Sequence, residues 1–254
     1  MFHGFLRAVK LELLNLKERK WSIFFYILIP AIIIWVFRAS ATMPITWGDY
    51  ASLNLKMYDL VASDVFSLVI LFVAVQLMVL RIVGERSPYG TLDRELIAIS
   101  RTGMYFGKLL ANALIVILQV ALVYLVGYVI FPAKNYGNPI HVFFFLFLIG
   151  VFGLISGYTV SLFSKNKEQA VQLIPFFILL FLLFSGMLIK LDQMPANLRI
   201  LAENLPFTLG VQSLKTLTLD GVGFEDVQWN VLKLGIWILL LVSMGVLKFV
   251  LEEK

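Results

Sequence analysis

Six long apolar segments constrain the fold of this 254-residue chain more than any other feature. They cover residues 21–37, 59–80, 104–131, 140–163, 170–189 and 229–250. At about 1.5 Å of rise per residue, helices of these lengths cross a hydrocarbon core of ~30 Å, although the first is marginal. Hydrophobic residues make up 60% of the chain and charged residues 15%, which leaves more apolar surface than a soluble fold of this size buries. The sequence therefore predicts a polytopic membrane protein.

The same segments favour helices over a transmembrane barrel. In hydrocarbon every backbone polar group needs a partner inside the protein, so only helices and closed barrels can span a membrane. Barrel strands alternate apolar and polar residues, whereas residues 142–153 (VFFFLFLIGVFG) are apolar on every side. We therefore expect one all-α membrane domain over residues 1–254, with six transmembrane helices.

The distribution of Lys and Arg predicts the orientation. Fourteen of them fall in residues 1–20, 81–108, 164–169 and 248–254, and six fall in residues 38–58, 132–139 and 190–228. Because basic residues accumulate on the cytoplasmic side of membrane proteins, both termini are expected in the cytoplasm.

Short helical patterns occur outside the spans. In residues 1–20, apolar positions recur every three to four residues with basic residues between them, which predicts an amphipathic helix in the membrane interface. The alternative, a signal peptide, is disfavoured because the apolar run 21–37 is too long. In the outer loop 190–228, residues 195–203 and 206–219 each begin with a proline, as helices often do. The second is apolar enough to enter the outer leaflet.

The charged loop after the second span carries another helical pattern. Thr91 suits an N-cap position, and Leu92, Leu96 and Ile97 would share one face. An exposed helix with an apolar stripe needs a partner surface. We therefore expect residues 84–100 to contact another protein.

Two motifs imitate enzymatic sites without their spacing. Residues 103–109 have three residues between the glycines and Leu109 after Lys108, whereas a phosphate-binding loop needs four residues and a Ser or Thr. Lys108 is better explained as an anchor at the membrane surface. Ser156 and His141 would lie ~22 Å apart on one helix, too far for a nucleophile and its base. Since the chain also has no cysteine, we predict no catalytic residue, no metal site and no cofactor bound by this chain.

Several residues inside the spans have two interpretations. Gln76, Asn112 and Gln119 either form hydrogen bonds between helices or line a substrate path. Pro175 forms either a packing kink or a gate, together with Ser185 and Gly186 near the outer end of its span. Gly153 and Gly157, spaced four apart, predict a close helix–helix approach.

The order of these elements resembles the ABC-2 permease family, the transmembrane subunits of a class of ATP-binding-cassette exporters. The likeness covers nearly the whole chain. Its most specific part is the stretch after the second span that contains Glu85-Arg86, Gly90-Thr91-Leu92 and Leu96, followed by Gly107-Lys108-Leu109. The series Phe184-Ser185-Gly186, Met194-Pro195 and Asn204-Leu205-Pro206 is similar to the family's outer-loop pattern.

The resemblance implies that the loop after the second span forms a coupling helix that docks on a separate ATPase. The residues that match the motif, and so become candidate ATPase contacts, are Glu85, Arg86, Gly90, Thr91, Leu92 and Leu96. It also implies two permeases, identical or different, and two ATPase subunits that hold ATP and Mg²⁺. The expected location is a prokaryotic plasma membrane, and no nucleic acid is expected as a partner.

The expected function is export of a hydrophobic or amphipathic substrate, such as a drug, natural product, lipid or peptide. A permease for polysaccharides or glycolipids is an alternative within the family. An ATPase-independent channel or scaffold is an alternative of another class, and a membrane-embedded enzyme would require polar groups that converge from different helices.

Overall fold

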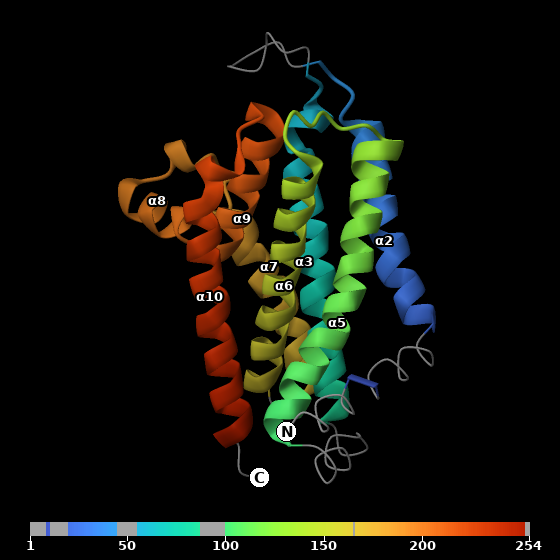
Figure 1. Cartoon of the computed structure of the whole chain (residues 1–254), viewed down its shortest axis with the longest axis vertical. Coiled ribbons are helices and arrows are strands. Elements are labelled where there is room, and N and C mark those ends of the chain that lie inside the picture. The colour runs from blue at the N-terminus through green and yellow to red at the C-terminus, as the bar shows by residue number, and fades with distance from the viewer. Residues whose placement is uncertain (1–8, 11–19, 45–54, 87–99, 165, 252–254) are drawn as a thin grey trace.

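Every regular element that the computed structural model describes is a helix (Figure 1). The described residues are 9–10, 20–44, 55–86, 100–164 and 166–251. In chain order the long helices are α2 (Lys20–Ser40), α3 (Met57–Glu85), α5 (Arg101–Tyr124, continued by the π-helix η2, Leu125–Ile130), α6 (Pro139–Phe163), α7 (Lys167–Phe184) and α10 (Phe224–Leu251). Between α7 and α10 lie the short elements η3 (Leu191–Gln193), α8 (Ala196–Glu203), α9 (Pro206–Lys215) and η4 (Thr216–Asp220). The all-α prediction is therefore confirmed for these residues.

Four of the helices are long and apolar enough to cross a membrane. They are α3, α5 with η2, α6 and α10. The helices α2 and α7 are apolar over shorter stretches, 24–40 and 168–184. The segment predicted at residues 170–189 ends early, at Phe184, because Gly186 adopts a left-handed φ of 81° that a helix cannot continue through. The amphipathic helix predicted for residues 1–20 lies almost wholly outside the described residues.

The helix α3 forms the centre of the bundle and packs closely along α6. Gly153 and Gly157 of α6 permit this approach. A Cβ at Gly153 would lie 2.8 Å from the Cβ of Ala74, and a Cβ at Gly157 would lie 2.6 Å from the carbonyl oxygen of Val75. The close approach predicted from the glycine spacing is therefore present.

The two ends of the bundle differ in character. We call the end where α3 stops and α5 starts the charged end, because Glu85, Arg86 and Arg101 lie there. The opposite end, with α8 and α9, is the short-helix end (Figure 1). There the mostly buried α9 packs against α6 and α10, while α8 is largely exposed.

The helix α9 also closes the end of α7. Thr208 Oγ1 donates a hydrogen bond to the carbonyl oxygen of Phe184 at 3.0 Å, and Gln212 Nε2 donates to that of Ser185 at 2.9 Å. The last carbonyls of a helix have no partner within the helix, so these side chains satisfy them. The end of α7 is thus tied to the short helices.

Candidate functional site

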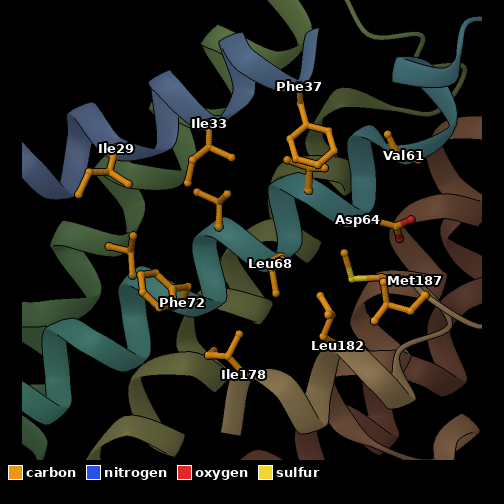
Figure 2. A pocket seen from close by; sticks show the side chains of 14 residues that line it. Ile29, Ile33, Phe37, Val61, Asp64, Leu68, Phe72, Ile178, Leu182 and Met187 are labelled. Atoms are coloured by element: carbon orange, nitrogen blue, oxygen red, sulfur yellow. The ribbon is translucent and has the colours of Figure 1, made fainter. Parts of the chain in front are cut away.

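A pocket of about 480 Å³ lies between α2, α3 and α7 (Figure 2). Ile29, Ile33 and Phe37 of α2 form one wall, and the other side is formed by α3 and by Ile178 and Leu182 of α7. Binding pockets for small molecules commonly enclose ~300–1,000 Å³ and are mostly apolar. The volume and lining therefore suit a hydrophobic small molecule or part of a larger one.

Asp64 of α3 is the exception in this apolar lining (Figure 2). Its side chain is buried, and its Oδ2 forms an ion pair with Nζ of Lys215, on α9, at 2.7 Å. The other oxygen, Oδ1, is buried and has no hydrogen-bond partner among the described residues. Sequence reasoning missed this residue. An acidic residue inside an apolar segment is a signal that could have found it.

Three charged side chains meet inside the bundle at the charged end. Glu85 Oε1 lies 3.2 Å from Arg81 Nε one turn earlier on α3, and Glu85 Oε2 lies 2.5 Å from Lys108 Nζ of α5. The exposed fractions are 2%, 5% and 1% for Arg81, Glu85 and Lys108. Charges this deeply buried require partners, and here they tie α3 to α5. The expectation of Lys108 as a surface anchor is therefore wrong: its ammonium group faces the interior.

Two arginines at the same end bind the carboxyl ends of other helices. Arg86 Nη1 donates to the carbonyl oxygen of Ser161 at 3.1 Å, near the end of α6. Arg101 Nη1 lies 3.5 Å from the carbonyl oxygen of Phe249, near the end of α10. A cation at a helix C-terminus interacts favourably with unpaired carbonyls and with the helix dipole. The residues that flank segment 87–99 are thus held by α6 and α10.

The predicted ATPase contacts divide into two groups. Gly90, Thr91, Leu92 and Leu96 lie outside the described residues. Glu85 and Arg86 are described, and both are engaged within the chain, Glu85 by Lys108 and Arg86 by the end of α6. Contact of any of the six with an ATPase stays a prediction.

The three polar residues proposed for the path are not among those that line the pocket. Asn112 is buried and donates through Nδ2 to the carbonyl oxygen of Lys108 at 2.7 Å. Gln119 is buried and lies 3.4 Å from the carbonyl oxygen of Val69. Gln76 is half-buried on α3. The Gln119 contact joins α5 to α3, as the first interpretation predicts, whereas the Asn112 bond lies within α5. A path-lining role for any of the three residues stays a prediction.

The kink residues occupy different positions on α7. Pro175 lies within the helix and is exposed. Ser185 is its C-cap, and Gly186 is the left-handed residue that ends it. The pocket includes Ile178 and Leu182, which lie between these points. A gating role for α7 stays a prediction.

Within the described residues no three His, Asp or Glu side chains are grouped to hold a metal ion. His141 and Ser156 lie near the start and past the middle of the same helix, α6, and do not converge.

Comparison with known proteins identifies the family. The sequence model of a family described as ABC-2 family transporter protein matches residues 38–251. The chain belongs to the ABC-2 family. Membership places it among the membrane components of ABC transporters, as the motif resemblance predicted. ABC transporter G family member 20 of Dictyostelium discoideum is 26% identical over 208 residues, which cover 81% of this chain. The match covers only 28% of that relative's length.

Proposed function

We propose that the chain is the permease of an ABC exporter that moves hydrophobic or amphipathic molecules out of the cytoplasm. The observation that carries the proposal is the apolar pocket between α2, α3 and α7 in a member of the ABC-2 family. A pocket at a junction of three helices can change shape when one helix shifts against the others. Substrate would enter it in one arrangement and leave it in another.

The proposed topology has six crossings with both termini in the cytoplasm. The four long apolar helices support four of these crossings, and α2 and α7 would supply the other two. The connections alternate between the two ends of the bundle, as six crossings require (Figure 1). With this orientation, the charged end faces the cytoplasm and the short-helix end faces outward.

The energy would come from an ABC ATPase that binds ATP and Mg²⁺ and presses on segment 84–100. The contacts at the charged end support a route for that force. Glu85 and Lys108 tie α3 to α5, while Arg86 ties the end of α3 to α6. A displacement of segment 84–100 would therefore move several helices together. A complex of two permeases and two ATPases, in a prokaryotic plasma membrane, belongs to the same proposal.

Purification of the tagged chain from its own cells tests the energy source. We expect an ABC ATPase to co-purify and Leu96→Arg to reduce that recovery, because a charge would interrupt the apolar stripe that Leu96 is expected to form. Leu201→Arg is the matched control, since Leu201 is exposed on α8 at the other end. Full ATPase recovery with Leu96→Arg would remove segment 84–100 as the docking site. Absence of any ATPase, together with ATP-independent transport, would favour the channel.

A further inference from the structure

The lining of the pocket between α2, α3 and α7 contains a single charged side chain, and it is acidic. Fourteen residues line the pocket, and among them Asp64 alone has an ionisable side chain. The paired ammonium of Lys215 belongs to α9 and is not part of the lining. Arg38 of α2 is likewise outside the lining, and its guanidinium lies over the ring of Tyr58.

The ion pair is therefore oriented with respect to the pocket. Its negative member lies at the pocket wall and its positive member lies beyond, toward α9. Oδ1 of Asp64 adds an acceptor that is buried and has no hydrogen-bond partner among the described residues. An unpaired buried acceptor is costly, and a charge acts more strongly beside apolar walls than in water.

We propose that Asp64 makes this pocket selective for lipophilic cations. The aliphatic and aromatic side chains hold the apolar body of the ligand, and the carboxylate holds its positive charge. This inference deepens the proposed export function, because it names the substrate class of the same pocket. It predicts discrimination by charge among molecules of equal size.

Binding of two matched ions to the purified full-length chain tests the proposal directly. Tetraphenylphosphonium and tetraphenylborate have similar size and shape and opposite charge. Equilibrium dialysis in a non-ionic detergent measures both, and the uptake of each ion by protein-free micelles is subtracted. We expect the wild-type chain to bind the phosphonium more tightly than the borate.

Variants at the ion pair should act in opposite directions. Asp64→Asn should weaken phosphonium binding by about tenfold, equivalent to about 1.4 kcal/mol. Lys215→Met should tighten it, because the cation that competes for Asp64 is removed. The double variant removes both charges and should bind the two ions equally. Asp59→Asn is the matched control: Asp59 is a buried carboxylate on the same helix, bonded to the backbone of Lys56 and Lys134 and outside the pocket.

A merely structural ion pair would give another pattern. Asp64→Asn and Lys215→Met would then both weaken binding of both ions, and this result would overturn the proposal. Equal binding of the two ions by the wild-type chain, or no phosphonium binding, would overturn it as well. Export of a neutral hydrophobic substrate by the reconstituted complex would leave the permease function standing in that case. Conversely, charge-selective binding without a partner ATPase would preserve this site and remove the exporter.

Discussion

The role of Glu85 that the motif predicts differs from the one that its contacts in the structure indicate. The motif makes Glu85 a candidate for ATPase contact, while the structure buries it between Arg81 and Lys108. Removing one member of a buried ion pair commonly costs ~3–5 kcal/mol, because the remaining charge stays buried without compensation. The primary role that these contacts support is to hold α3 and α5 together.

Glu85→Gln should accordingly destabilise the protein by about 3–5 kcal/mol, since it removes a buried carboxylate that pairs with both Arg81 and Lys108. Lys108→Met should cost less, because Glu85 keeps Arg81. Thermal unfolding of the purified chain in detergent measures both. Glu203→Gln is the matched control, and it should cause no measurable shift because the Glu203–Arg199 pair is exposed on α8. Equal stability of Glu85→Gln and wild type would contradict the role of Glu85 as an internal tie.

The close packing of α3 on α6 depends on glycines of α6, which have no side chain to hold the helices apart. At Gly157 an added methyl group would meet the backbone of Val75, which cannot rotate away. Gly157→Ala should therefore force the helices apart and destabilise the protein by about 1–3 kcal/mol. Gly235→Ala on α10 is the control, because nothing lies within 4 Å of a Cβ there. The control should be neutral or slightly stabilising, since alanine favours helices. If Gly157→Ala and Gly235→Ala changed the unfolding temperature equally, the packing of α6 would not depend on the close approach at Gly157.

Substitution of Arg86 distinguishes two roles for the end of α3, transmission of motion to α6 and direct contact with the ATPase. The Arg86 guanidinium donates to the end of α6, so Arg86→Met should leave the ATPase bound. Substrate-stimulated ATP hydrolysis should fall by about tenfold, equivalent to ~1.4 kcal/mol of activation free energy. Arg199→Met is the control, because Arg199 is exposed on α8. Co-purification and ATP hydrolysis are measured on the same preparation. Loss of the ATPase itself would instead support the direct contact predicted from the motif.

Hydropathy along the chain predicts where the helices lie, but not which side chains of different helices contact one another. Each of the segments 59–80, 104–131 and 140–163 coincides with a long helix, because an apolar run in lipid must satisfy its own backbone. The predicted end at Ile189 lies beyond the observed end of α7 because hydropathy averaged over a segment does not detect the left-handed backbone of Gly186. The pairing of Asp64 with Lys215 joins α3 to a helix far along the chain, and no local pattern encodes that contact. Lys108 was misassigned for the same reason.

The whole molecule offers a direct test of its topology because the chain has no cysteine. Single cysteines can therefore be placed on either side of α7, at Asn166 and Lys190, both of which are exposed. If α7 crosses the membrane, a maleimide that cannot enter cells should label Lys190→Cys in intact cells and Asn166→Cys only after the membrane is opened. Arg199→Cys, in the same connection between α7 and α10 as Lys190, should match Lys190→Cys. Labelling of both flanks from outside would mean that α7 does not cross. Labelling of Asn166→Cys alone would place the charged end outside, where no cytoplasmic ATPase could reach segment 84–100.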